Sequence, residues 1–231
     1  MEDLTSEEIL KGHLADNKTR KHEFFRYYNN KRMLHQLTQL KLLRDVEGDN
    51  LTEIGPYLGF STGLFLASGF KVHTVDVGPP NALGELTPNK HTRQNIRDIT
   101  QTTLAGSDVI VCCEVLEHLI FSEAEETLAK FHSSGAQSLL ISVPYRCFSI
   151  DIRIMYSSLS SFFSWIVKLP SKRFKKFQPE PEPEGHKWEL GYKGYPLPKL
   201  LKALDKAGFQ VAQTEYLGAV RSVFILSHRK Q

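Results

Sequence analysis

The sequence has 231 residues and a formal net charge of +3, and 41% of its residues are hydrophobic. A chain of this length can bury a core without disulfides or metals, so one domain with an elaboration is expected. The net charge is too small to indicate a nucleic-acid partner, and no apolar run approaches the ~20 residues of a membrane span.

Cysteine usage and the start of the chain bear on the cellular compartment. The three cysteines, Cys112, Cys113 and Cys147, have neither zinc-binding nor disulfide spacing, which favours a reducing compartment. The first thirty residues are polar and charged and do not resemble a secretory signal. A cytoplasmic location is therefore expected.

The amino-terminal part, residues 1–47, is predicted to form a helical cap. Apolar residues between positions 4 and 14 suggest a short first helix with Ser6 as its N-cap. An amphipathic pattern over 24–43 predicts a second, longer helix.

Residues 48–143 alternate between strand-like and helix-like patterns. Strands are predicted in five places: 51–54, 71–75, around 95–96, 107–113 and 138–143. Helices are predicted at two places, of which the second has Ser122 as its cap: 59–68 and 122–132. Alternation of this kind predicts a doubly wound α/β fold, with a parallel sheet between two layers of helices.

The segment 144–196 lies outside this alternation and is expected to form a lid or acceptor-binding insertion. Apolar residues at helical spacing predict a helix over 152–169. This helix is either a lid packed on the core or, because a basic run follows it, an interfacial element that contacts an anionic membrane through 148–176. Nucleic-acid phosphates are a third partner for the basic run, although aromatic residues are sparse there.

The remaining residues, 197–231, are expected to complete the core. A predicted helix over 197–207 is closed by Gly208. Two strand-like runs, 209–215 and 222–227, follow and are joined by a short connection that contains glycine, which is a hairpin pattern.

Acidic residues and glycines follow the ends of the predicted strands in a regular order. Because parallel strands of an open sheet present ligand-binding groups at their carboxyl ends, these residues are the candidate cofactor site. They are Glu53, Gly55, Tyr57, Gly59, Asp76, Asp98, Ile99, Cys113 and Glu114. Asp76 lies about twenty residues beyond Gly55, the offset at which a carboxylate meets ribose hydroxyls. The alternative is ordinary turn chemistry at Gly55 and Asp76, and an exposed loop acid at Asp98.

Together with the segment 108–119, DVIVCCEVLEHL, this order resembles the class I S-adenosylmethionine-dependent methyltransferases, of the type 11 or 23 kind. The family fingerprint is an acid followed by Gly-x-Gly-x-Gly, and Tyr57 replaces the middle glycine here. The resemblance implies S-adenosylmethionine as cofactor and a Rossmann-like core over 48–143. It also implies a seven-stranded sheet with a carboxyl-terminal antiparallel hairpin, amino-terminal helices and a lid insertion after the fifth strand.

The resemblance further implies a role for each candidate residue. Glu53 is expected to hold the ammonium end of the cofactor, and Asp76 to accept from the ribose hydroxyls. Asp98 is expected to accept a hydrogen bond from the adenine amino group, and Ile99 is expected to pack on the adenine ring. The backbone of residues 113 and 114 is expected to face the methionine moiety.

The candidates for catalysis are His118, His186 and Glu114, because a hydroxyl acceptor benefits from a general base. At helical spacing, Glu114, Glu117 and His118 would share one face and could hold a divalent ion, with His186 completing the shell. This Glu-x-x-Glu-His arrangement is similar to the metal-binding motif of ubiquinone-biosynthesis O-methyltransferases. It is also similar to that of the small-RNA 3′-end 2′-O-methyltransferases, which add a distal histidine. The alternative is a metal-free pocket that Glu117 and His118 only line.

The candidate acceptor pocket contains Tyr145, which follows the fifth strand, and Trp188 and Glu189. The last two resemble a His-x-Trp-Glu-x-Gly segment of a group of bacterial methyltransferases; a structured loop with buried Trp188 is the alternative. The expected acceptor is an O or N atom of a small-molecule, lipid-linked or glycan substrate. Metal-dependent RNA 2′-O-methylation and a catalytically silent, methyltransferase-like binding module are the other readings. A nicotinamide oxidoreductase is disfavoured by Pro56 and Tyr57 in the glycine-rich turn and by the terminal hairpin.

Overall fold

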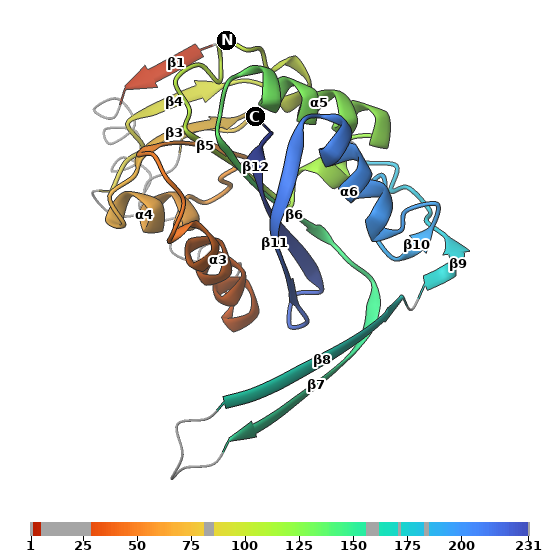
Figure 1. Ribbon diagram of the computed structural model, residues 1–231. Helices are drawn as coiled ribbons and strands as arrows, with labels where there is room; N and C mark the ends of the chain where they lie inside the picture. Colours follow the sequence, from red (N-terminus) through yellow and green to blue (C-terminus); the bar gives the residue numbers. More distant parts are fainter. Residues whose placement is uncertain are drawn as a thin grey trace.

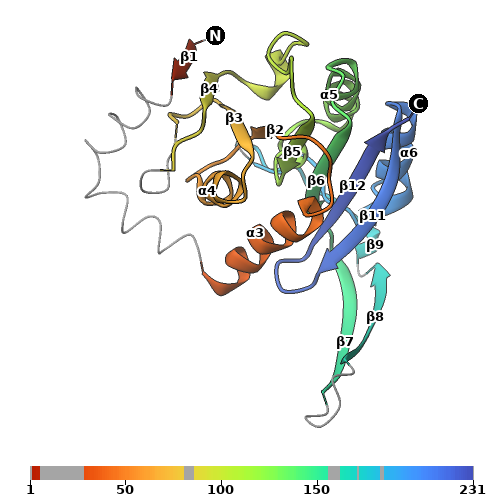
Figure 2. The same ribbon diagram turned by 60° about the vertical axis from the view of Figure 1, so that its left-hand side comes forward.

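The computed structural model describes residues 2–5, 29–80, 86–155, 162–170, 172–182 and 185–230. Within these ranges one central sheet separates two layers of helices, and a long hairpin extends away from this body (Figures 1 and 2). None of the described helices is long and apolar enough to cross a membrane.

The central sheet has eight strands, of which five adjacent ones run parallel. In spatial order the strands are β1 (Glu2–Thr5), β4 (Lys90–Arg93), β3 (Lys71–Asp76), β2 (Asn50–Ile54), β5 (Val109–Cys113), β6 (Ser138–Pro144), β12 (Ser222–Arg229) and β11 (Phe209–Leu217). β12 pairs antiparallel with β6, and β11 pairs antiparallel with β12. The predicted doubly wound fold, with seven strands and a terminal antiparallel hairpin, is therefore confirmed, and β1 adds an eighth strand at the edge.

The residues of β5 explain how the sheet holds a layer of helices on each face. The described α-helices are α3 (Asn30–Leu43), α4 (Phe60–Ala67), α5 (Phe121–Ser133) and α6 (Leu197–Lys206). Val109 and Val111 belong to the apolar cluster under α3 and α4, whereas Ile110 and Cys112 belong to the cluster under α5 and α6. Successive side chains of a strand point to opposite faces, so a strand covered on both sides is apolar throughout.

The amino-terminal prediction is confirmed in one part and wrong in another. α3 is a helix, and the side chain of Asn29 caps it by accepting the backbone N–H groups of Lys31 and Arg32. The helical cap predicted over 1–47 is wrong at residues 2–5, which form β1 because the open edge of β4 offers unpaired backbone groups. The predicted first helix, with Ser6 as its N-cap, and the amphipathic pattern up to residue 28 lie outside the described residues.

The third strand lies earlier in the chain than predicted. It occupies Lys90–Arg93, whereas Ile96–Asp98 forms a single 3₁₀ turn, η1. The side chain of Asn95 accepts the backbone N–H of Arg97 (3.0 Å), a local hydrogen bond that favours a turn over a strand.

Helix α5 begins at Phe121, and its N-cap lies two residues earlier than predicted. Its N-cap is Ile120 rather than Ser122. The carboxylate of Glu123 accepts the backbone N–H of Ile120 (3.1 Å), so a glutamate in the first turn satisfies the donor that a cap would otherwise leave open.

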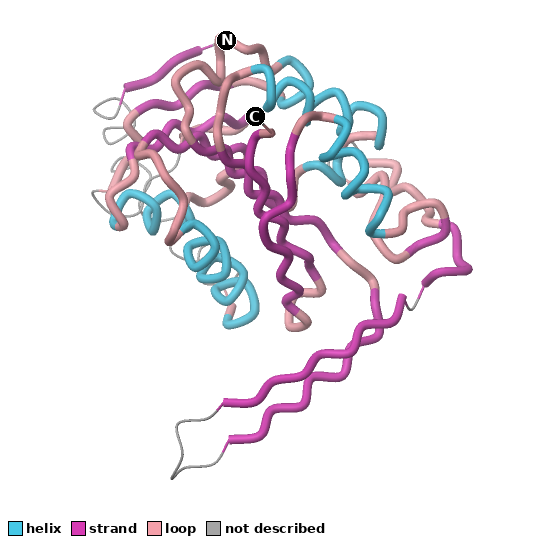
Figure 3. The backbone as a smooth tube through the Cα atoms, in the orientation of Figure 1, coloured by secondary structure: helices cyan, strands magenta, loops and turns pink. Residues whose placement is uncertain are grey.

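The insertion contains a β-hairpin. The helix predicted over 152–169 is wrong at 152–155 and 162–169, and residues 156–161 lie outside the described residues. β7 (Cys147–Met155) pairs antiparallel with β8 (Phe162–Pro170) in a two-stranded sheet of its own (Figure 3). The sequence F-S-I-D-I-R-I over 148–154 alternates apolar and polar residues and is rich in β-branched side chains, which favours a strand. The apolar positions fit both the helical period and the two-residue period of a strand. The alternating polar residues between them are what distinguishes the strand from the helix.

The basic run after this hairpin is also a strand. β9 (Lys172–Lys176) pairs in parallel with β10 (Tyr192–Lys193). The Pro/Glu spacer, residues 178–185, lies between these two strands in the chain. The spacer residues 178–182 are exposed, as their composition predicts.

Candidate functional site

A tight loop joins β2 to α4 at the carboxyl edge of the parallel strands. Gly55, Tyr57 and Gly59 all have positive φ, of 70°, 53° and 76°. A Cβ on Gly55 would lie 2.7 Å from Cγ2 of Val115, so a glycine is needed where these two chain segments meet. The left-handed conformation is uncommon for tyrosine, and the side chain of Tyr57 is half exposed. The loop therefore keeps a glycine-like turn at the substituted position.

Glu53, at the end of β2, is hydrogen-bonded to the helix that follows this loop. Its buried carboxylate accepts hydrogen bonds from the hydroxyls of Ser61 and, at 2.5 Å, Thr62 in the first turns of α4. Burial raises the pKa of Glu53 to about 7, although the two hydroxyls oppose the rise, and the charge of Asp76 adds to it. The carboxylate predicted to meet the cofactor thus lies beside the loop in a buried, hydroxyl-lined position.

The two predicted nucleoside-binding elements differ in their exposure. Asp76 is half-buried at the end of β3, and its Oδ1 accepts the backbone N–H of Gly78 (2.8 Å), as turn chemistry requires. Asp98 is exposed at the end of η1. Ile99 is buried in the apolar cluster under α5 and α6, so its side chain is already packed by the protein.

The end of β5 holds Glu114 in a left-handed conformation, with φ of 55°. Its Oε1 accepts from the Ser142 hydroxyl (2.9 Å) and lies 3.5 Å from Nε2 of His35, which is itself 3.1 Å from that hydroxyl. Burial raises the pKa of Glu114, but His35 and Ser142 outweigh it and hold the pKa below its usual value. Burial also raises the pKa of the neighbouring Cys113 thiol well above its usual range, so that thiol is neutral.

His35 is a site residue that was not predicted from the sequence. It lies on α3, and together with Thr38 and Gln39 it forms a buried polar stripe on a face that contains leucines. Nδ1 of His35 is 3.0 Å from the Gln39 amide nitrogen. Three polar residues at i, i+3 and i+4 on the packed side of an amphipathic helix were the available signal.

Three of the four predicted metal ligands gather beyond the end of β5. Leu116–His118 forms a short 3₁₀ turn, η2, and His186 approaches it from the segment after the spacer. The candidate ligand atoms of Glu117, His118 and His186 lie within 4.8 Å of one another. The fourth predicted ligand, Glu114, is turned toward His35 instead, because its left-handed backbone takes it out of the helical spacing assumed for it.

Glu117 is the most deeply buried member of this cluster. Its side chain is 0% exposed, and neither carboxylate oxygen accepts a hydrogen bond from another described residue. Burial raises the pKa of Glu117 well above its usual range, and the charges of Glu114 and Glu189 add to the rise. A buried carboxylate without hydrogen bonds is costly unless a cation or another ligand completes it.

The donor set fits a divalent ion. Two imidazoles and one carboxylate suit ions such as Mn²⁺ and Zn²⁺. Two ligands of one such ion are at most about 4.2 Å apart, so a contraction of about half an ångström closes the cluster. Glu117, His118 and His186 are thus able to hold a metal with small side-chain movements.

The predicted acceptor residues are mostly occupied by the protein. Trp188 is fully buried, and its Nε1 donates to the carbonyl of Leu119 (3.0 Å). It therefore matches the alternative of a structured loop with a buried tryptophan. Glu189 is buried and binds Arg146 and His186. Tyr145 is 8% exposed, and burial raises its pKa. Each of these side chains is packed against other parts of the protein, and their role in an acceptor pocket stays a prediction.

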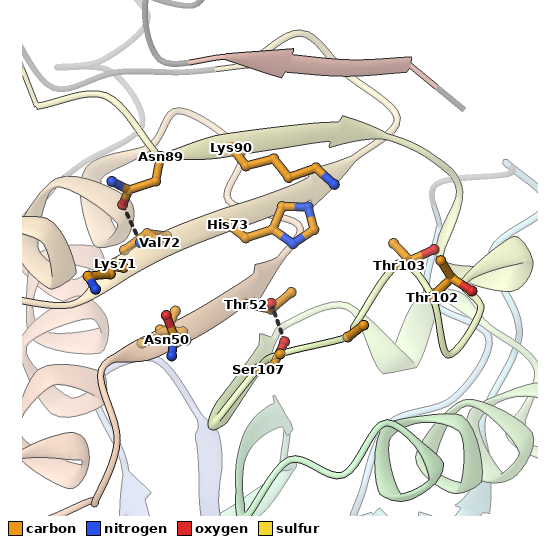
Figure 4. A pocket seen from close by; sticks show the side chains of 13 residues that line it. Asn50, Thr52, Lys71, Val72, His73, Asn89, Lys90, Thr102, Thr103 and Ser107 are labelled. Atoms are coloured by element: carbon orange, nitrogen blue, oxygen red, sulfur yellow. Dashed lines mark hydrogen bonds between the residues drawn. The ribbon is translucent and has the colours of Figure 1, made fainter.

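A cavity of about 290 Å³ lies at the opposite edge of the sheet (Figure 4). It is lined mainly by polar residues at the amino ends of β2, β3 and β4 and in the loop before β5, which include Asn50, Thr52, His73, Lys90 and Ser107. Thr52 and Ser107 join hydroxyls across it at 2.6 Å. This cavity contains none of the candidate cofactor or metal residues.

Comparison of the structure with solved proteins identifies the fold. The chain is similar to the Burkholderia thailandensis 1,6-didemethyltoxoflavin-N1-methyltransferase bound to 1,6-didemethyltoxoflavin and S-adenosylhomocysteine, with a TM-score of 0.58, 14% identity, and coverage of 96% of this chain and 88% of that one. It is also similar to magnesium protoporphyrin IX methyltransferase from Synechocystis PCC 6803 bound to S-adenosylhomocysteine (TM-score 0.58, 16% identity, 93% and 96% covered).

A third similar structure is the small RNA methyltransferase HEN1, with a TM-score of 0.59, 16% identity, and coverage of 87% of this chain and 25% of that one. No protein-family model and no curated protein matches the sequence. The chain therefore has the fold of the class I methyltransferases, as its sequence predicts.

Proposed function

We propose that this protein transfers the methyl group of S-adenosylmethionine to an oxygen or nitrogen of a small-molecule, lipid-linked or glycan acceptor. The observation that carries the proposal is the left-handed loop of Gly55, Tyr57 and Gly59, with Glu53 and Asp76 at adjacent strand ends. Similar structures with S-adenosylmethionine or its product bound add support.

In this proposal the parallel strands present the cofactor residues in order along one edge. The open backbone of Gly55 lets the cofactor approach the chain, and the start of α4 favours its carboxylate. Asp76 accepts from the ribose hydroxyls with the oxygen that Gly78 does not occupy. The protein then contributes mainly alignment of the acceptor with the methyl group, which is worth roughly 7–11 kcal/mol.

We further propose that Glu117, His118 and His186 hold a divalent ion beside this site. The buried carboxylate oxygens of Glu117 and the spacing of the three ligand atoms support it. Such an ion, when bound, acidifies a hydroxyl acceptor. Glu114, which His35 and Ser142 keep ionised, is the base proposed for that hydroxyl.

The β7–β8 hairpin favours a lipid-linked acceptor among these classes. Its register pairs Ile150 with Val167 and Ile152 with Trp165, so one row of paired positions is apolar. A two-stranded hairpin is marginally stable in water by itself, and the basic strand β9 follows directly. An anionic membrane suits both features, because its apolar boundary can take up the apolar row of the hairpin and its negative charge attracts the basic strand β9.

Metal-dependent 2′-O-methylation of RNA is the second candidate function. The Glu117, His118 and His186 cluster favours it, together with the likeness to the small RNA methyltransferase. The low net charge of +3 weighs against it, because RNA binding depends on phosphate neutralisation.

Calorimetry with S-adenosylhomocysteine and with NAD tests the cofactor assignment. We expect the full chain to bind S-adenosylhomocysteine and not NAD. Asp76→Ala should weaken this binding at least about tenfold, since two hydroxyl contacts are lost. Asp45→Ala, at an exposed acid beside Arg44, is the matched control and should bind normally. An inert wild-type chain would identify a silent module, and NAD binding would identify an oxidoreductase.

The acceptor class is tested by transfer of a radiolabelled methyl group into fractionated lipid, glycan, RNA and metabolite pools. Sedimentation with neutral and anionic vesicles examines the hairpin separately. We expect salt-sensitive binding to anionic vesicles, weakened about tenfold or more by the double change Lys175→Glu and Lys176→Glu. The double change Lys202→Glu and Lys206→Glu on α6 is the matched control. Label in the RNA pool alone, without vesicle binding, would select the second candidate.

A further inference from the structure

His186 belongs to a chain of hydrogen-bonded polar side chains that continues through Glu189 to Arg146. The Glu189 carboxylate accepts from Nδ1 of His186 (3.0 Å) and from Nε of Arg146 (2.6 Å), with Nη2 of Arg146 3.3 Å away. Glu189 is only 5% exposed at its side chain, whereas Arg146 reaches partly into solvent. The other ring nitrogen of His186, Nε2, lies 4.0 Å from Oε1 of Glu117.

This arrangement selects one tautomer of His186. A neutral imidazole carries a single N–H, and an ionised carboxylate can only accept. Glu189, paired with the guanidinium of Arg146, therefore places the proton on Nδ1 and leaves the lone pair on Nε2. That lone pair is directed toward Glu117 and His118, where a metal ligand requires it.

The backbone holds both ends of the chain in place. Arg146 donates its N–H to Leu190 O (2.9 Å), next to Glu189, and Lys187 donates its N–H to Glu117 O (2.7 Å), next to His186. A Cβ on Gly191 would lie 2.1 Å from the carbonyl oxygen of Arg146, so only glycine lets these segments meet. The imidazole is consequently oriented by main-chain contacts on both sides.

We propose that Glu189 and Arg146 are positioning residues, which fix the tautomer and orientation of His186 so that Nε2 serves as a metal ligand. The inference rests on the proposed metal site. A histidine ligand commonly donates its second ring N–H to a carboxylate, and loss of that partner typically weakens metal binding about 10–100-fold.

The test measures Mn²⁺ affinity of the full-length protein by calorimetry and by electron paramagnetic resonance. We expect Glu189→Gln to weaken Mn²⁺ binding about 10–100-fold, and Arg146→Met to weaken it less, because Glu189 itself remains. Glu123→Gln removes a glutamate that also pairs with an arginine, Arg97, and should leave the Mn²⁺ affinity unchanged. Melting temperature and S-adenosylhomocysteine affinity establish that each variant is folded.

Nitrogen-15 spectra of the metal-free wild-type protein give an independent readout. The proton of His186 should be on Nδ1, and Glu189→Gln should populate the other tautomer. A proton on Nε2 in the wild type overturns the inference, as does Mn²⁺ affinity within twofold of wild type in Glu189→Gln. Wild-type protein that binds S-adenosylhomocysteine but not Mn²⁺ overturns the inference and the metal site together, and leaves the methyltransferase assignment standing.

Discussion

The buried carboxylate of Glu53 makes the stability of this protein depend on pH in a predictable direction. Its pKa in the folded protein is about 7, against an ordinary value of 4.5, chiefly because of burial. The folded chain therefore keeps a proton that the unfolded chain releases. Stability from this group is fully present below pH 4.5 and is lost as the pH rises through about 7.

The size of the effect follows from that difference. Each pH unit between the two pKa values is worth about 1.4 kcal/mol, which gives about 3 kcal/mol in total. About 2–3 kcal/mol of this falls between pH 5 and pH 8. Glu53→Gln removes the ionisation, and its amide can still hydrogen-bond both Ser61 and Thr62, because the oxygen accepts from one hydroxyl and the nitrogen donates to the other. The free energy of unfolding of wild type minus that of the variant should thus fall by about 2–3 kcal/mol over this range.

Urea unfolding at several pH values, followed by tryptophan fluorescence, measures this difference. Other titrating groups cancel, because they are common to both proteins. Glu126→Gln, at an exposed position on α5, is the control and should give a difference that does not change with pH. A Glu53→Gln difference that is constant within about 0.5 kcal/mol from pH 5 to pH 8 would refute the argument from burial.

Two further predictions concern stability at fixed pH. Gly191→Ala should lower the free energy of unfolding by about 3 kcal/mol or more, because a positive φ of 90° and the Arg146 carbonyl both oppose a Cβ. Gly135→Ala, with φ of 94° and open space around it, should lower it by only about 1 kcal/mol, and equal losses would contradict the steric account. His35→Phe should cost about 1–3 kcal/mol, since Ser142 loses a buried partner. His35→Gln should recover part of that loss in urea unfolding, and a fully stable His35→Phe would contradict this role.

Much of the fold could be predicted from the sequence because its signals are local. The apolar run of β5, the amphipathic α6 with Gly208 after it, and the strand patterns of β11 and β12 each report their own burial. The candidate cofactor residues could be found in the same way, since they follow strand ends directly. Their roles in binding remain predictions.

The insertion and the cap of α5 show where local reading fails. Apolar residues in 148–169 taken alone fit both a helix and a strand, whereas the alternating polar residues of 148–154 favour the strand that pairing between β7 and β8 completes. Ser122 has the chemistry of a cap, but Glu123 reaches the N–H of Ile120 and moves the helix start.

The sequence by itself determined the alternation of strands and helices in the core, the loop after β2 and the residue types of the site. Only the tertiary structure decided which of these residues meet. The Glu114 carboxylate lies beside His35 on α3 and not with the other predicted ligands, and Glu189 contacts both His186 and Arg146. The physical reason is that backbone conformation at single residues, such as the left-handed Glu114, and hydrogen bonds between distant segments set where a buried charge points.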